Sequence, residues 1–217
     1  MLEKELIIAL PKGRILSELK SLFTKIGFVP EADFYNEESR KLIFSTNILN
    51  VKIIKVRSFD VATFVKFGAA DIGICGLDVL EEFSSPEIYR LFDLGIGKCR
   101  LSIAARKNSD INFRNKSHVR IASKYVNLTN NYFSALGIQD ECIKLNGAME
   151  LAPHLNLCDF IVDLVSTGKT LEDNNLVEIE KIIDVTSYFV ANKNSLKTKS
   201  ADLNKIIKLF GINLFAN

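Results

Sequence analysis

The chain has 217 residues, of which 47% are hydrophobic and 25% are charged, and its formal net charge at pH 7 is +2. A net charge this close to zero gives no electrostatic reason to expect a nucleic-acid partner. No apolar run approaches the roughly 18 residues of a membrane-spanning helix, and the N-terminus lacks the basic region of a signal peptide, so we expect a cytoplasmic protein with no membrane partner.

The first half of the chain alternates short apolar runs with longer amphipathic segments, which is the pattern of an α/β fold. The expected strands are 5–10, 41–46, 51–56, 71–76 and 87–106. The expected helices are 13–28 and 60–70, and we expect Asp60 to cap the second. The first helix has an apolar stripe formed by Ile15, Leu16, Leu19, Leu22, Phe23 and Ile26.

The second half repeats this alternation. Its expected strands are 119–123, 141–146 and 159–165, and its expected helices are 127–137, 148–157 and 200–215. The stripe of the last helix is Leu203, Ile206, Ile207, Phe210 and Leu214. Long strands near 95–105 and 177–191 lack linker composition, so we interpret them as two crossovers between two lobes with a central cleft. The predicted boundaries are 1–97 plus 181–217 for lobe I and 98–180 for lobe II.

The cysteines and histidines give no sign of a metal site. The four cysteines are Cys75, Cys99, Cys142 and Cys158. They form no Cys-x-x-Cys pair, and their apolar surroundings predict buried, reduced thiols. Neither His118 nor His154 has a second ligand at zinc spacing. We expect His154 to be a partly buried helical residue rather than a general base.

The segment "DLVSTGKTL", residues 163–171, ends like a nucleotide-binding P-loop, whose pattern is G-x-x-x-x-G-K-[ST]. Asp163 stands where the first glycine belongs, and its carboxylate would repel a polyphosphate wrapped by the loop. The match is therefore either chance or a loop for a different phosphorylated ligand. The hydroxyls and backbone N–H groups of residues 166–170 suit one small phosphate, beside a point charge from Lys169.

Asp163 has a counterpart in Glu150 of "LNGAMEL", which follows the preceding strand. Two carboxylates at neighbouring strand ends suit the vicinal hydroxyls of a sugar, and the loop at 166–170 suits its terminal phosphate. Together they predict a phosphoribosyl ligand. Taken alone, Glu150 equally fits an exposed helical position.

Three further turns place cations or glycines beside predicted strands. "LPKGR", residues 10–14, puts two cations at a helix N-terminus, which suits an anion but equally fits a solvated turn. Arg57 begins "RSFDV" and Gly76 ends a strand, positions that fit either a ligand or a tight turn. Arg40 precedes a strand and either enters a cleft or stays on the surface.

These motifs, in this order, resemble the catalytic subunit of the ATP phosphoribosyltransferase family. The resemblance covers nearly the whole chain and is most specific in "KLNGAMELAP" and "DFIVDLVSTGKTL". It implies two lobes like those of type II periplasmic binding proteins. It also implies transfer of the 5-phosphoribosyl group of 5-phosphoribosyl 1-pyrophosphate (PRPP) to a ring nitrogen of ATP, with Mg²⁺ as cofactor, as the first step of histidine biosynthesis.

The resemblance also implies partners and residue roles. The chain resembles the short form of the family, which implies catalytic-subunit dimers within a hetero-oligomer and a regulatory subunit similar to histidyl-tRNA synthetase. The expected catalytic residues are Arg14 and Arg40. The expected PRPP-binding residues are Glu150, Asp163, Ser166, Thr167, Gly168, Lys169 and Thr170. The expected ATP-binding residues are Lys12, Gly13, Arg57, Asp60 and Gly76.

The residues by themselves leave two other classes open. One is a non-catalytic pair of lobes that binds a solute, and the other is a phosphoribosyltransferase with a different acceptor. The protein ligands of Mg²⁺ are also left open, because substrate phosphates and water can hold most of that ion.

Overall fold

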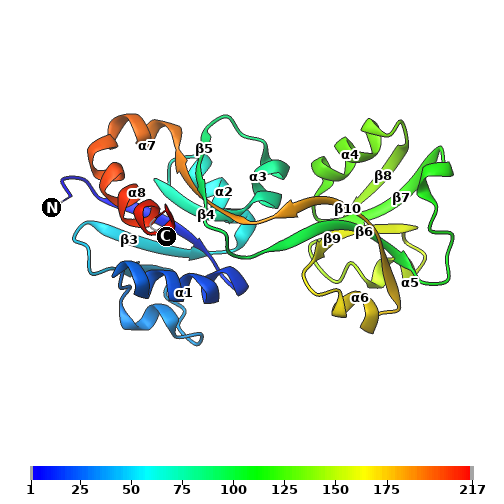
Figure 1. The fold of residues 1–217 in the computed structure, drawn as a ribbon, viewed down its shortest axis with the longest axis horizontal. Coiled ribbons are helices and arrows are strands. Elements are labelled where there is room, and N and C mark those ends of the chain that lie inside the picture. Colours follow the sequence, from blue (N-terminus) through cyan, green and yellow to red (C-terminus); the bar gives the residue numbers. More distant parts are fainter. Residues whose placement is uncertain (1, 216–217) are drawn as a thin grey trace. The chain divides into compact units, whose positions relative to one another are not determined.

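The computed structural model describes residues 2–215, and it describes side chains as far as Gly211. These residues form two compact units, each with its own sheet (Figure 1). Unit 1 comprises the residues up to Leu80, Ser84–Gly97 and the residues from Thr186 onward. Unit 2 comprises Glu81–Phe83 and Lys98–Val185. The return into unit 1 therefore follows Val185, whereas the sequence prediction placed it after residue 180.

Unit 1 contains a six-stranded sheet in the order β2-β3-β1-β4-β11-β5. The strands are β1 (Leu6–Pro11), β2 (Ile43–Ser45), β3 (Val51–Val56), β4 (Ile72–Gly76), β5 (Ile88–Asp93) and β11 (Ser187–Asn192). The central strands β3, β1 and β4 are parallel, and the other three pair antiparallel to their neighbours. The buried runs of β1 and β4 fit this position, because strands covered on both faces are apolar along most of their length.

The first and last helices of unit 1 pack their predicted apolar stripes against the core, where most of the described side chains are buried and the others partly buried. The helices are α1 (Arg14–Ile26), α2 (Ser58–Lys66), α7 (Lys193–Thr198) and α8 (Ser200–Phe215), with a 3-10 turn at Ala32–Tyr35. Helix α3 (Leu77–Phe83) begins in unit 1, and its last residues, Glu81–Phe83, belong to unit 2. In α1 the ring of Phe23 packs edge-on against Phe28 at 4.9 Å and Phe210 of α8 at 6.0 Å. Burying one such ring stabilises the fold by about 1.5–3 kcal/mol. Leu214, predicted in the α8 stripe, lies outside the described side chains.

Unit 2 contains a five-stranded sheet in the order β10-β6-β9-β7-β8. Its strands are β6 (Cys99–Arg106), β7 (His118–Ser123), β8 (Gln139–Lys144), β9 (Phe160–Val165) and β10 (Leu176–Val185). Its helices are α4 (Val126–Ala135), α5 (Leu151–His154) and α6 (Lys169–Asp173), with a 3-10 turn at Phe113–Asn115. Strands β9, β7 and β8 run parallel to one another. Strand β6 runs antiparallel to β9, and β10 runs antiparallel to β6.

Each of the two long predicted strands is in fact two strands. The first breaks between β5 and β6, where Gly95 and Gly97 have φ of 67° and 66°, a backbone region that glycine enters without steric cost. The second breaks at Thr186, whose hydroxyl donates to Asp93 at 2.8 Å. At both breaks the chain passes from one sheet to the other, so it cannot continue as a single paired strand.

Three smaller predictions also need correction. Asp60 lies in the first turn of α2, and Arg57 occupies the N-cap position without a side-chain capping bond. His154 is exposed, and its Nε2 lies 2.7 Å from the carbonyl oxygen of Asn174. All four cysteines are free as predicted, but Cys99 and Cys142 are only half-buried.

Within residues 2–215, no helix combines the length and the apolar character that a membrane span requires.

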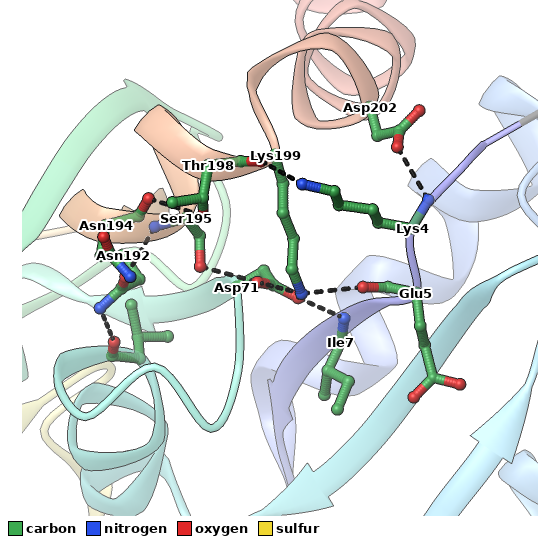
Figure 2. A network of polar contacts seen from close by, with 11 residues as sticks. Lys4, Glu5, Ile7, Asp71, Asn192, Asn194, Ser195, Thr198, Lys199 and Asp202 are labelled. Carbon is green, nitrogen blue, oxygen red and sulfur yellow. Dashed lines mark hydrogen bonds and ion pairs between the residues drawn. The ribbon is translucent and has the colours of Figure 1, made fainter.

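A buried carboxylate, Asp71, ties the last segment of unit 1 to its first strand (Figure 2). Its side chain accepts hydrogen bonds from the backbone N–H of Ile7 at 2.9 Å and from the hydroxyl of Ser195 at 2.7 Å. The ammonium of Lys199 pairs with both of its oxygens, at 2.9 and 3.0 Å. Asp71 is only 3% exposed, so these donors replace the water it would have in the unfolded chain.

We predict that Asp71→Asn lowers the free energy of unfolding by about 2–3 kcal/mol. The amide keeps the volume but removes the charge that pairs with Lys199, and its NH₂ group cannot accept a bond from the Ile7 N–H or the Lys199 ammonium. Chemical denaturation measures the difference. The control is Asp184→Asn, which breaks an exposed pair with Lys181 and should cost no more than about 0.5 kcal/mol. Equal losses in the two variants would contradict a central role for Asp71.

Candidate active site

A pocket in unit 2 collects most of the residues predicted to bind PRPP. Its lining includes Glu150, Asp163, Ser166, Thr167, Gly168 and Thr170. The rest of the wall consists of Ser102 and Ala104 of β6 and of Ile161, Leu164, Val165 and Leu171. The lining therefore combines several polar groups with apolar side chains, as is usual for small-ligand pockets.

The loop between β9 and α6 forms one side of the pocket. Gly168 precedes α6 with φ of 84°, and no atom lies within 4 Å of the position that a Cβ would take. The hydroxyl of Thr167 accepts a long bond of 3.4 Å from the N–H of Lys169. Lys169 begins α6 and is exposed, and it is not among the pocket-lining residues.

The two carboxylates of the pocket come from different parts of the sheet. Asp163 lies within β9, opposite Ser102 of β6, and its Oδ1 accepts from the N–H of Leu164 at 2.8 Å. Glu150 follows β8 and directly precedes α5. The strands β8 and β9, predicted to be neighbours, are separated by β7. Glu150 nevertheless reaches the pocket, because α5 packs on β6 and β9.

Sequence reasoning missed a cluster beside this pocket, formed by Arg100 and Ser102 of β6 and Glu178 of β10. Arg100 donates Nε and Nη2 to the two carboxylate oxygens of Glu178, at 2.6 and 2.5 Å. These bonds hold the pKa of Glu178 below its ordinary value, against the opposing effect of burial. The alternation of Arg100 and Ser102 along one strand was the available signal, because period-two spacing places both on one face.

In unit 1 the predicted ATP-binding and catalytic residues gather at one edge of the sheet. Lys12, Gly13 and Arg14 follow β1, Arg57 follows β3, and Gly76 ends β4. These three strands are parallel neighbours, so their carboxyl ends lie together. Arg40 belongs to the same edge. It lies just before β2, which runs antiparallel to β3 and begins opposite the end of that strand.

This edge of unit 1 is rich in positive charge. Arg14 donates Nη2 to the carbonyl of Gly97 at 3.2 Å, and Lys12, Arg40 and Arg57 are exposed. None of these four cations belongs to an ion pair recorded within residues 2–215. Burial lowers the pKa of the nearby Lys55, and the charge of Lys12 lowers it further. Asp33 and Glu37 act on Lys55 in the opposite direction, so the positive charge offered to an anion comes mainly from Lys12, Arg14, Arg40 and Arg57.

Comparison with solved structures defines the class first. The chain is similar to the alkanesulfonate-binding protein SsuA from Xanthomonas axonopodis pv. citri bound to MOPS, with a TM-score of 0.58, 12% identity, and coverage of 97% of this chain and 73% of that one. At that identity the likeness concerns the fold alone. The chain thus has the two-lobed α/β fold of type II periplasmic binding proteins.

The sequence comparisons are more specific. The family model described as "HisG: ATP phosphoribosyltransferase" matches residues 57–211. The ATP phosphoribosyltransferase of Rhodospirillum rubrum is 54% identical over 208 residues, covering 95% of this chain and 92% of that protein. That of Novosphingobium aromaticivorans is 53% identical over 208 residues, with 94% and 93% covered. A solved ATP phosphoribosyl transferase (HisG:HisZ) complex from Thermotoga maritima has a TM-score of 0.79 and 31% identity, with 94% and 96% covered.

The chain belongs to the ATP phosphoribosyltransferase family, and it transfers the 5-phosphoribosyl group of PRPP to a ring nitrogen of ATP in the first step of histidine biosynthesis. Pyrophosphate is the second product. Identities of 53–54% to such transferases, against 12% to a solute-binding protein, decide between the classes that the residues alone left open.

We predict that Gly168→Ala raises the KM for PRPP about tenfold or more. Alanine at φ of 84° costs roughly 1–2 kcal/mol, so the loop would relax away from its present conformation. Gly137→Ala is the matched control, because Gly137 has φ of 72°, also has open space at its Cβ, and lies at the end of α4. Steady-state kinetics measure both. A similar KM in the two variants would contradict a substrate contact at Gly168.

Proposed function

We propose that the unit 2 pocket binds the phosphoribosyl part of PRPP. In this assignment residues 166–170 hold the 5-phosphate, and Glu150 and Asp163 accept hydrogen bonds from the ribose hydroxyls. The observation that carries the proposal is the lining of one pocket by both carboxylates and by the hydroxyls and backbone of the loop. Hydroxyl and N–H donors suit a phosphate, whereas carboxylates accept from hydroxyls and repel phosphate.

Lys169 has a separate role in this proposal. Its side chain does not line the pocket, so we assign it a long-range attraction for the phosphate rather than a fixed hydrogen bond. The backbone N–H of the same residue, which makes only a long bond of 3.4 Å to the Thr167 hydroxyl, would instead donate to the phosphate. A flexible ammonium acts as a point charge, which needs no single geometry.

The cationic edge of unit 1 is assigned to ATP and to the departing pyrophosphate. The attacking nitrogen of adenine has its own lone pair, so the protein need not supply a nucleophile. Charge develops instead on the leaving diphosphate, and Arg14 and Arg40 would stabilise it. Lys12, Gly13, Arg57, Asp60 and Gly76 are assigned to the ATP side.

Losing the guanidinium of Arg14 in Arg14→Met should lower kcat about a hundredfold, which corresponds to roughly 3 kcal/mol of barrier.

Mg²⁺ is the proposed cofactor, carried by the diphosphate of PRPP. Within residues 2–215 no group of three or more metal-binding side chains could hold an ion by itself. Mg²⁺ commonly keeps several waters and binds through one or two carboxylates plus substrate phosphates. Asp163 and Glu150 are the pocket carboxylates that could contribute. When bound, the ion would neutralise charge on the leaving group, and activity should disappear with a chelator and return with added Mg²⁺.

A regulatory subunit similar to histidyl-tRNA synthetase is the proposed partner, joined to dimers of this chain in a cytoplasmic hetero-oligomer. The support is the HisG:HisZ complex from Thermotoga maritima, whose transferase chain matches 94% of this one. Co-elution of the two subunits in size-exclusion chromatography tests this assembly. Two separate peaks at concentrations that support full activity would contradict it.

We predict that Asp163→Asn raises the KM for PRPP at least tenfold, because an amide offers only one acceptor where the carboxylate offers two. The KM for ATP should change less than about twofold, and the melting temperature should stay within a few degrees. Pyrophosphate release measures the kinetics. The control is Asp159→Asn, which removes an exposed carboxylate that contacts Arg120. A collapse of stability without a change in KM would assign Asp163 a structural role.

A further inference from the structure

The cluster of Arg100, Ser102 and Glu178 contacts residues 166–170, here called the phosphate loop. Besides its two bonds to Glu178, Arg100 donates Nη1 to the carbonyl oxygen of Ser166 at 3.2 Å. Ser166 is the first residue of the loop and lines the pocket. The guanidinium therefore connects the sheet to the start of the loop.

Glu178 holds the guanidinium in one orientation. Its Oε1 accepts from Arg100 Nε at 2.6 Å and from the hydroxyl of Ser102 at 2.7 Å, while its Oε2 accepts from Arg100 Nη2 at 2.5 Å. Two parallel bonds to a planar fork leave it no freedom to rotate. With Nε and Nη2 fixed, Nη1 is directed at Ser166. Lysine carries the same charge but has no planar fork, so it cannot make this set of bonds.

A β-bulge in β10 accounts for the position of Glu178. The register of β10 against β6 shifts between Glu178, which faces Ala104, and Glu180, which faces Ile103. Ala104 and Ile103 are consecutive, so they point to opposite faces of the sheet. In a regular strand the two glutamates would share a face. The bulge instead directs Glu178 to the pocket side, as bulges beside active sites often do with a side chain.

Glu180, on the other face of β10, forms a second arginine–glutamate pair for comparison. It accepts hydrogen bonds from Arg114, which follows Phe113 in a 3-10 turn, and from the hydroxyl of Tyr132 in α4. Among the described residues, the bonds of this pair connect secondary-structure elements, and none of them reaches residues 166–170. Both pairs join an arginine to a glutamate of β10, but only the pair of Glu178 contacts the loop.

We propose that Arg100 and Glu178 are positioning residues for the phosphate loop of the transferase reaction. Arg100 fixes the Ser166 carbonyl, and this fixes the direction of the peptide groups that follow in Thr167 and Gly168. Neutralised by Glu178, Arg100 acts through geometry rather than through its net charge on the substrate. The inference rests on the proposed binding of the 5-phosphate by this loop.

The test measures PRPP binding by calorimetry with Mg²⁺, together with KM, kcat and melting temperature, in the full chain. Arg100→Lys keeps the charge and should weaken PRPP binding about tenfold or more, with the KM for ATP within about twofold of wild type. Glu178→Gln should weaken PRPP binding similarly. The double variant should be no worse than either single one, because residues that act as one unit are not additive.

Arg114→Lys is the matched control. It loosens a more exposed arginine–glutamate pair on the other face of β10, so it should lower the melting temperature no more than Arg100→Lys does and should leave PRPP binding unchanged. Wild-type PRPP binding in Arg100→Lys, or equal weakening in Arg114→Lys, would overturn the inference.

Ribose 5-phosphate separates this inference from the proposed function. If it binds the wild-type chain and Gly168→Ala weakens that binding, the loop is the phosphate site, and normal binding in Arg100→Lys then overturns only the positioning role. If Gly168→Ala binds ribose 5-phosphate as tightly as the wild type does, the phosphate site itself is misplaced and both proposals fall.

Discussion

Parallel strand pairing is the constraint on which the candidate binding region of each unit depends. In a parallel sheet the carboxyl ends of neighbouring strands lie at one edge, and the residues that follow them gather there. Unit 1 uses β3, β1 and β4 to collect cations from three separate turns. Unit 2 uses β9, β7 and β8, with β6 beside β9, to collect carboxylates and a phosphate-type loop. Each unit thus brings together groups far apart in the chain.

A discontinuous unit also needs a strong internal connection. Unit 1 is built from the beginning and the end of the chain, with nearly all of unit 2 inserted between them. Asp71 makes that connection, since it binds Ile7 of β1, Ser195 of α7 and Lys199 at once (Figure 2). Burying this carboxylate costs free energy, and that cost is offset only when the segments that supply its hydrogen-bond donors have all folded against it. The connection therefore links the fold of the last segment to the strand that leads to Lys12 and Arg14.

The sequence predicted the local elements, the motifs and the two-lobed α/β fold, but it did not predict the order of the strands within each sheet. The stripes of α1 and α8 and the missing glycine at Asp163 are local signals, so they could be read directly. Strand order is not local, which is why β7 came unexpectedly between β8 and β9. The break near Gly97 was missed although Gly95 and Gly97 were available as turn signals, whereas Thr186 follows the apolar run of β10 without a glycine or proline to mark the break. Glu178 was missed because the face of the sheet on which it lies depends on a bulge. Strict alternation would put Glu178 and Glu180 on the same face.

The central claim is that a small phosphate loop and two carboxylates recognise a phosphorylated pentose. A crystal structure of the chain with ribose 5-phosphate tests it most directly. The account predicts phosphate oxygens within about 3.2 Å of the backbone nitrogens of residues 167–170, and ribose hydroxyls against Glu150 and Asp163. A phosphate bound instead at the cationic edge of unit 1, with the unit 2 pocket empty, would contradict it.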